Sequence, residues 1–261
     1  ESVPYNGISE SNYERVYINS EGAFRSVKRT QASIYLYART QQENKKPRSS
    51  GALRLASGAQ DLDINGCIKE ASKRTISHLE YQPIETGKYM VCFKPEAFLD
   101  LINAFSNIFN ARSILDGVSL SKKDSIGQII SVPFFNLDDN GLHEDNIGAI
   151  PFDGEGTPTQ KLNLIKNGRI TNFLHSEATA RAFKVKPTGH AGLGSKVSVG
   201  PDWFIVSKTG DNNPGKERFH HKTTNTPFVL IENLSALHAG IKSTQGSFSL
   251  PFDGWLVNNG K

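Results

Sequence analysis

The stretch Lys161-Leu-Asn-Leu-Ile-Lys-Asn-Gly-Arg-Ile-Thr-Asn-Phe-Leu174 decides the fold class, because it reads as two strands joined by a two-residue turn. Asn167 and Gly168 are the residue types that accept the positive φ angles of such a turn. A turn at this place pairs Leu164 with Thr171 on one face and lets the strands extend over the whole stretch. The sequence therefore predicts an antiparallel β-hairpin.

Similar turn signals recur on both sides of this hairpin. Eight Asn-Gly or Asp-Gly dipeptides occur in the 261 residues, and the tetrapeptide Pro-Phe-Asp-Gly begins both at Pro151 and at Pro251. A proline that opens a strand is tolerated at the edge of a sheet, because the missing N–H group is not needed there. Further strands are expected in the segments 15–39, 88–93, 203–207, 228–233 and 254–257. Much of the fold is therefore expected to be β.

Apolar residues at helical spacing predict two amphipathic helices. The first, with Asn65 as its N-cap, is expected to bury Ile68, Ala71, Thr75, Ile76 and Leu79. The second opens at Pro95 and is expected to bury Phe98, Leu101, Ile102, Phe105, Ile108 and Phe109. A short helix is expected over residues 176–183.

Together these elements predict an α+β fold. Residues 83–261 are expected to form a β-rich C-terminal region of antiparallel or mixed sheet with a few amphipathic helices. Residues 1–82 are expected to form a smaller strand-and-helix region before it. The only methionine is Met90, so the chain reads as processed or cut.

Composition excludes several classes of protein. Apolar residues make up 37% and charged residues 21%, which is typical of a folded chain. No stretch approaches the ~18 consecutive apolar residues of a membrane helix. Two cysteines without a C-x-x-C pair favour a reducing, cytoplasmic location. The net charge of +4 is too small to indicate nucleic-acid binding.

Motifs for metal or nucleophilic chemistry are sparse. The sequence contains no G-x-S-x-G motif, and His190 has no second metal ligand at helical spacing. The segment from Asp61 to Gly66 imitates the start of a calcium loop, but Ser72 occupies the twelfth position, so a turn with a helix cap is favoured.

A group of carboxylates remains. Asp138, Asp139, Glu144 and Asp145 precede Asp153 and Glu155, and such a group can bind a cation or share a proton. An acidic loop that leads into a glycine-rich turn is the favoured interpretation.

Several ordered motifs resemble the TldD/PmbA family over nearly the whole chain. The longest runs from Pro151 to Leu174 and reads PFDGEGTPTQKLNLIKNGRITNFL. The shorter ones are Ile18-Asn-Ser-Glu-Gly22, Thr86-Gly-Lys-Tyr89, Ala178-Thr-Ala180, Pro187-Thr-Gly189 and Gln245-Gly-Ser-Phe-Ser249. The resemblance implies that members of the family extend before Glu1 and past Lys261, so that this chain lacks an N-terminal domain and the last C-terminal strands, with an unpaired sheet edge near Lys261.

The resemblance also implies a role. The family forms a peptidase system in which a TldD-type subunit carries a zinc-binding H-E-x-x-x-H helix and a PmbA (TldE-type) subunit does not. At the corresponding positions this chain has Ile102, Asn103 and Asn107, so it is similar to the PmbA type. The resemblance therefore implies no catalytic residue, metal or cofactor in this chain and a zinc ion in a TldD-type partner.

Unfolded peptide is the implied substrate, and the chain is expected to dimerise with itself or with a TldD-type subunit. The best-matched motif residues are expected to be structural and are Asp153, Glu155, Gly156, Asn167, Gly168, Thr188 and Gly189. The family was once described as modulators of DNA gyrase, so a regulatory protein that binds gyrase or another DNA-associated partner is the alternative. A peptidase that works alone through Cys92 or the acidic group is a third hypothesis.

Overall fold

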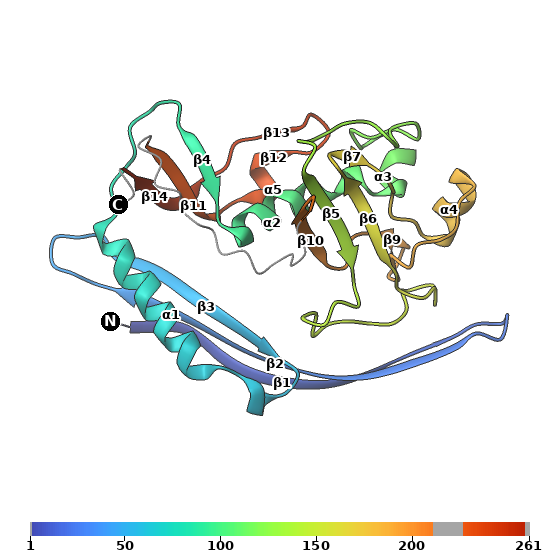
Figure 1. Ribbon diagram of the computed structural model, residues 1–261. Helices are drawn as coiled ribbons and strands as arrows, with labels where there is room; N and C mark the ends of the chain where they lie inside the picture. The colour runs from blue at the N-terminus through green and yellow to red at the C-terminus, as the bar shows by residue number, and fades with distance from the viewer. Residues whose placement is uncertain (1, 211–226, 259–261) are drawn as a thin grey trace. The chain divides into compact units, whose positions relative to one another are not determined.

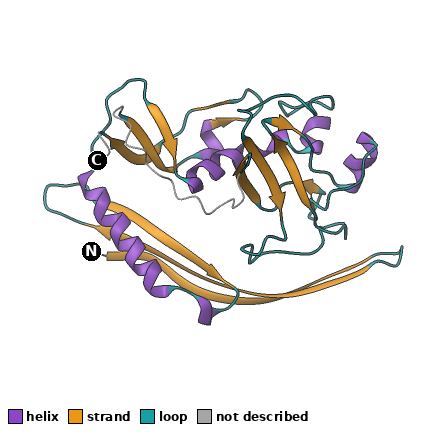
Figure 2. Ribbon diagram, in the orientation of Figure 1, coloured by secondary structure: helices purple, strands orange, loops and turns teal. Residues whose placement is uncertain are grey.

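The computed structural model describes residues 2–210 and 227–258, which belong to two compact units (Figure 1). The first unit contains Glu1–Glu85 and Glu144–Ala149, and the second contains Thr86–His143 and Ile150–Lys261. Both mix strands with helices, which confirms the predicted α+β class (Figure 2). None of the described helices is long and apolar enough to span a membrane. The predicted sheet edge near Lys261 lies outside the described residues.

The first unit is a three-stranded antiparallel sheet in the order β1-β2-β3, with helix α1 packed against β2 and β3 (Figure 1). Its elements are β1 (Ser2–Ile18), β2 (Phe24–Thr40), β3 (Arg48–Ala56) and α1 (Ile64–Ser77). Gly22 adopts a φ of 82° at the turn between β1 and β2. The strand pair expected within residues 15–39 is therefore confirmed.

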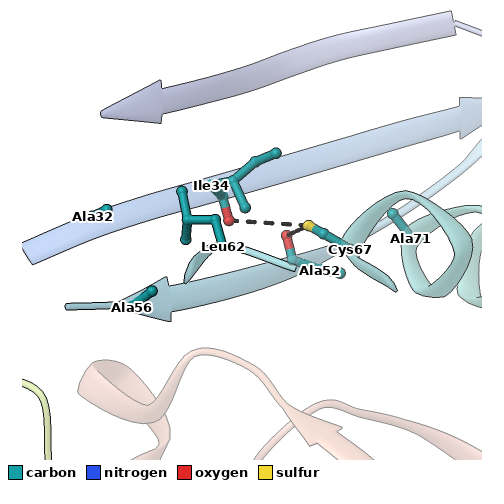
Figure 3. Packing of buried hydrophobic residues seen from close by; sticks show 7 residues of the cluster. All are labelled: Ala32, Ile34, Ala52, Ala56, Leu62, Cys67 and Ala71. Carbon is teal, nitrogen blue, oxygen red and sulfur yellow. Dashed lines mark hydrogen bonds between the residues drawn. The ribbon is translucent and has the colours of Figure 1, made fainter. Parts of the chain in front are cut away.

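Small side chains let α1 approach the sheet closely (Figure 3). Cys67 is fully buried, and its Sγ lies 3.5 Å from the carbonyl oxygen of Ala52. Burial raises the pKa of the Cys67 thiol. The other buried residues of this core are Ala32, Ile34, Ala52, Ala56, Leu62 and Ala71.

The predicted buried face of α1 is partly wrong. Cys67, Ala71 and Thr75, four residues apart, are the buried residues of the helix, whereas Ile68 and Ile76 are exposed by 43% and 54%. The N-cap is Asp63 rather than Asn65, because the Asp63 carboxylate accepts the N–H of Gly66 at 2.8 Å. The alanines of the sheet bring the backbone of the helix close to the strands. Only the helix face with the small side chains of Cys67, Ala71 and Thr75 fits into this space, and the larger isoleucines do not.

The second unit contains a mixed three-stranded sheet, in which β11 lies between β14 and β4 and runs parallel only to β4. A four-stranded antiparallel sheet has the order β10-β5-β6-β7. The strands of these two sheets are β4 (Met90–Phe93), β5 (Phe135–Asn140), β6 (Lys161–Lys166), β7 (Arg169–Ile170), β10 (Phe204–Lys208), β11 (Phe228–Leu234) and β14 (Phe252–Val257). The antiparallel and mixed character predicted for this region is confirmed.

Short elements complete the second unit. Its helices are α2 (Pro95–Ala104), α3 (Ala111–Leu115), α4 (Glu177–Phe183) and α5 (Leu237–Gly240). The short paired strands are β8 (Ala191–Gly192) with β9 (Ser198–Val199), and β12 (Ile241–Lys242) with β13 (Ser247–Phe248). The Ser176 hydroxyl caps α4 by accepting the N–H of Thr179, as expected of a helix that starts there.

The β6–β7 hairpin has the predicted turn but is shorter than expected. Asn167 and Gly168 have φ angles of 51° and 76°, and Ile165 pairs with Ile170. The ladder stops at Ile170 because the chain then turns toward the segment before α3, where the N–H of Leu174 bonds to the carbonyl oxygen of Phe109 at 2.7 Å.

The helix predicted from Pro95 is also shorter, because it ends at Ala104. The N–H of Phe105 bonds to the carbonyl oxygen of Ile102, which tightens the last turn, and a 3₁₀ helix follows at Ser106–Ile108. The predicted apolar stripe still contributes to the core, since Ile102, Ile108 and Phe109 pack with residues of β5 and β6.

Candidate functional site

Ile102, the first of the three positions that correspond to the zinc motif, packs in an apolar core. This residue lies against a cluster formed by Phe109, Leu137, Leu164, Ile165, Leu174 and Val199. It also lines an apolar cavity of about 520 Å³, together with Phe98, Phe105, Val132, Phe135 and Phe248. A borderline metal ion needs nitrogen, sulfur or oxygen ligands, so this wall does not fit zinc.

The other two motif positions do not fit zinc either. Asn103 is exposed on α2. Asn107 follows the end of that helix, and its Nδ2 donates to the carbonyl oxygen of Val118 at 3.0 Å and to Ser243 Oγ at 3.2 Å. The Asn107 side chain therefore joins two loops. Because the helix ends between these two asparagines, they do not present ligands from one helical face.

Asp153 is a buried carboxylate that organises the loop after Pro151. Its Oδ1 accepts the N–H groups of Glu155 and Thr157, each at 2.9 Å, and its Oδ2 accepts the N–H of Ala191 at 2.9 Å. Three backbone donors on one carboxylate hold the loop against β8. The structure therefore places Asp153 in a positioning role for the backbone.

Glu155 extends this arrangement to the helix α4. Its Oε2 accepts the N–H of Glu177, the first residue of α4, at 2.7 Å. A carboxylate at this end compensates both an unpaired N–H group and the positive end of the helix dipole. Gly156 has a φ of 78° and completes the turn. These three motif residues form one structural loop.

Thr188 and Gly189 lie beside that loop. Gly189 has a φ of 75° and leaves no room for a Cβ, which would overlap the carbonyl oxygen of Pro158. The Thr188 Oγ1 accepts the N–H of His175 at 2.7 Å and lies 2.9 Å from the Nδ1 of His190. The structure thus brings five of the motif residues together, namely Asp153, Glu155, Gly156, Thr188 and Gly189.

Asn167 and Gly168 do not join this group. They follow the end of β6 at Lys166, whereas the loop of Asp153 leads into its start at Lys161. The Asn167 Oδ1 accepts the hydroxyl of Thr209 at 2.6 Å, so this turn is tied to the residue after β10.

His175 is a buried imidazole within this network. Burial, with a smaller effect from the neighbouring His190, lowers the pKa of His175 from 6.5 to about 4. Its ring makes an edge contact with Phe183, with the centroids 4.9 Å apart. His175 is therefore neutral at physiological pH.

Asp139 and His190 form a buried pair that the sequence did not indicate. Asp139 lies on β5, and its two oxygens accept the N–H groups of Asp202 and Trp203 at 2.9 and 3.0 Å. The His190 Nε2 lies 3.8 Å from Asp139 Oδ1, and both side chains are fully buried. The interpretation of Asp138 and Asp139 as part of an acidic loop is wrong, because both belong to the strand.

No spacing in the sequence could have indicated this pair. Asp139, His190 and the exposed Asp202 come from three separate segments. They meet because β10, which follows Asp202, pairs with β5, and because His190, the residue before β8, lies against Asp139. The ligand atoms of the three side chains lie within 4.8 Å of one another.

Comparison with known proteins identifies the family. The model of the PmbA/TldA metallopeptidase C-terminal domain matches residues 86–261, and that of the central domain matches residues 1–79. The chain belongs to the TldD/PmbA family. The resemblance inferred from the loop at Pro151 and the neighbouring motifs is therefore confirmed.

Individual TldD/PmbA relatives agree with this assignment. The metalloprotease PmbA of Escherichia coli O157:H7 is 30% identical over 128 residues, which is 47% of this chain and 27% of that protein. A metalloprotease of Methanocaldococcus jannaschii is 29% identical over 146 residues, 54% of this chain and 32% of that protein. The matched part is thus about a third or less of each of these relatives.

Two solved TldD/PmbA structures share the fold. A proposed modulator of DNA gyrase from Thermotoga maritima superposes with a TM-score of 0.87 at 28% identity, over 99% of this chain and 58% of that one. TldE from Thermococcus kodakarensis superposes with a TM-score of 0.82 at 18% identity, over 98% of this chain and 57% of that one. This chain spans a little over half the length of either.

Proposed function

We propose that this chain is part of a PmbA/TldE-like subunit, which carries no catalytic zinc and assists a zinc-bearing TldD-type partner in hydrolysing unfolded peptides. The observation that carries the proposal is that the zinc-motif positions offer no set of metal ligands. Ile102 packs in an apolar core, and the Asn107 side chain is hydrogen-bonded to two loops. Family membership supplies the peptidase context.

The structural loop at Asp153 supports the same role. Its carboxylates hold backbone N–H groups, so they position main chain in this subunit. Hydrolysis then depends on the zinc and the base of the partner's H-E-x-x-x-H helix, and this chain contributes surface for the peptide and for the partner. A cytoplasmic location stays a prediction from the cysteine content.

The gyrase alternative stays a prediction, supported by the descriptions of two structurally similar proteins, from Thermotoga maritima and Bacteroides thetaiotaomicron, as modulators of DNA gyrase. It expects salt-sensitive association with gyrase or DNA. A gyrase-supercoiling assay at low salt with and without the purified chain would test it, and an unchanged supercoiling rate would remove it.

The experiment that tests the proposal is a reconstitution. The chain and an H-E-x-x-x-H-bearing subunit from the same host are purified separately, and the release of fragments from an unfolded fluorescent peptide is measured for each and for the mixture. We expect the mixture to exceed the sum of the separate rates, and replacement of the partner's motif glutamate to abolish hydrolysis.

A matched variant in this chain sharpens the test. Asn103 is exposed on α2, at the position of the motif glutamate, so Asn103→Ala should leave the rate of the mixture unchanged. Hydrolysis by this chain alone that a chelator stops and Asn103→Ala abolishes would contradict the proposal. A pull-down from the native host is an independent test, and we expect the chain to bring down a protein with the H-E-x-x-x-H motif.

A further inference from the structure

Asp139, His190 and Asp202, here named the Asp-His-Asp cluster, gather three metal-binding side chains in the second unit. Asp139 and His190 are buried, Asp202 is exposed, and their ligand atoms lie within 4.8 Å of one another. Among the residues that the structure describes, this cluster is the group whose geometry suits a metal ion. Its residues come from other segments of the chain than the zinc-motif positions Ile102 and Asn107.

An unpaired polar atom points into this cluster. The Nε2 of His190 is buried and has no hydrogen-bond partner among the described residues. It faces Asp139 Oδ1 at 3.8 Å, which is too long for a hydrogen bond. A buried polar atom without a hydrogen-bond partner destabilises the fold by about 1–3 kcal/mol. A bound ligand at Nε2 would remove this cost. A metal ion between the two side chains would bind both.

The hydrogen bond on the other side of the ring selects the tautomer that binds metals. Thr188 Oγ1 lies 2.9 Å from His190 Nδ1. The Thr188 hydroxyl can donate its proton to the carbonyl oxygen of His175, 3.2 Å away, so that it accepts a hydrogen bond from His190. His190 Nδ1 then carries the hydrogen, and the lone pair is on Nε2. Metal-bound histidines donate their other ring N–H to a fixed acceptor, which sets the tautomer and the ring orientation, and Thr188 Oγ1 supplies such an acceptor here.

The carboxylate of Asp139 is held in the same manner. The N–H groups of Asp202 and Trp203 fix its two oxygens, and each oxygen retains a second lone pair. These bonds also bring the backbone of Asp202 to the cluster. A buried carboxylate gains from a cation nearby, because burial removes the solvation of its charge.

Asp202 gives the cluster access to solvent. Its side chain is exposed, and its Oδ2 lies over Gly141, where a Cβ would come within 2.8 Å of that oxygen. The glycine thus leaves room for the carboxylate at the mouth of the cluster. An ion can enter on this side without opening the core.

We propose that the Asp-His-Asp cluster binds a divalent transition-metal ion of the zinc type, with Asp139, His190 and Asp202 as protein ligands. The imidazole ligand favours zinc or a similar ion over calcium and magnesium, which prefer oxygen ligands alone. The ion joins β5 to the segments that immediately precede β8 and β10. This proposal goes beyond the peptidase role, holds with or without a partner subunit, and revises the expectation that the chain holds no metal.

The test uses the chain without a histidine tag, first stripped of metal with EDTA. Zn²⁺ and Co²⁺ are then titrated separately, with calorimetry for Zn²⁺ and visible absorption for Co²⁺. We expect one ion per chain, a visible Co²⁺ band that reports a nitrogen-containing ligand set, and a raised thermal midpoint. Asp202→Asn should weaken binding by about tenfold or more, because it removes an exposed ligand.

Two further variants complete the design. His190→Gln should abolish the Co²⁺ band, and its far-ultraviolet circular dichroism shows whether the variant folds. Asp138→Asn is the matched control, because Asp138 lies next to Asp139 on β5 but forms an ion pair with Lys161 at 3.0 Å; it should bind as the parent chain does. Absence of Zn²⁺ and Co²⁺ binding at millimolar concentration, or equal binding by Asp202→Asn, would overturn the proposal.

Discussion

Replacing Asp153 by asparagine tests whether its carboxylate organises the motif loop. Asparagine has nearly the same shape, but its NH₂ group would face the N–H of Ala191, which Oδ2 accepts at 2.9 Å. The bonds from Glu155 and Thr157 to Oδ1 can remain, although a neutral amide oxygen accepts more weakly than a carboxylate.

The structure gives the size of the effect. The buried N–H of Ala191 loses its acceptor, which costs about 2 kcal/mol, and each weakened bond costs about 0.5 kcal/mol. The free energy of unfolding of the second unit should therefore fall by about 3 kcal/mol. For a unit of this size that change lowers the thermal midpoint by roughly 6–12 °C.

The chain provides both a probe and a control. Its two tryptophans, Trp203 and Trp255, both lie in the second unit, so urea unfolding followed by their fluorescence reports on that unit. Asp253 occupies the same place in the second Pro-Phe-Asp-Gly tetrapeptide, but its carboxylate makes no hydrogen bond to a described residue. Asp253→Asn should change stability by less than about 0.5 kcal/mol.

Equal destabilisation by Asp153→Asn and Asp253→Asn would refute the reasoning. So would a loss of less than about 1 kcal/mol for Asp153→Asn, since a buried donor without an acceptor costs at least that much.

Three further predictions concern the second unit. In thermal unfolding, Gly168→Ala should destabilise this unit by at least about 1 kcal/mol more than Gly117→Ala. Both glycines have a positive φ, but only at Gly168 would an added Cβ meet a backbone oxygen, that of Ser131 at 2.5 Å. Equal losses of stability would contradict this. In EDTA, the free energy of unfolding should fall by up to about 3 kcal/mol between pH 6.5 and 4. The unfolded state takes up a proton at His175 in this range, whereas the folded state, in which the pKa of His175 is about 4, does not. Urea titrations of His175→Phe should show a weaker dependence of stability on pH, and an unchanged pH dependence would refute the assignment. Lys184→Gly should raise the thermal midpoint, corresponding to about 1 kcal/mol, because Lys184 ends α4 with a φ of 60° that glycine adopts without strain; a lowered midpoint would contradict this.

Local sequence was sufficient where the determinant is local. The Asn167-Gly168 turn was predictable because few residue pairs adopt its φ angles, and Ser176 was predictable as the start of α4 because its hydroxyl accepts an N–H within the same turn. Both features need only a few consecutive residues.

Local sequence was insufficient where a distant segment decides. Periodicity alone could not show that the alanines of β2 and β3 select the Cys67 face of α1 over Ile68 and Ile76. Nor could it show that Asp139 would meet His190, because a strand pairing and a loop contact bring them together. Such contacts depend on tertiary packing, which overrides the local preference.

The two Pro-Phe-Asp-Gly tetrapeptides show the difference between what the local sequence determines and what distant contacts determine. In the first copy Phe152 is 2% exposed and Asp153 holds three N–H groups, whereas in the second Phe252 is 38% exposed on the edge strand β14. Glycine is needed in both copies for different reasons, since a Cβ would strike the N–H of Leu193 at Gly154 and the backbone of Leu230 at Gly254. The glycine of the tetrapeptide thus allows close approach to a neighbouring segment of backbone in both copies. The neighbouring segment then determines whether the aspartate finds N–H groups to bind.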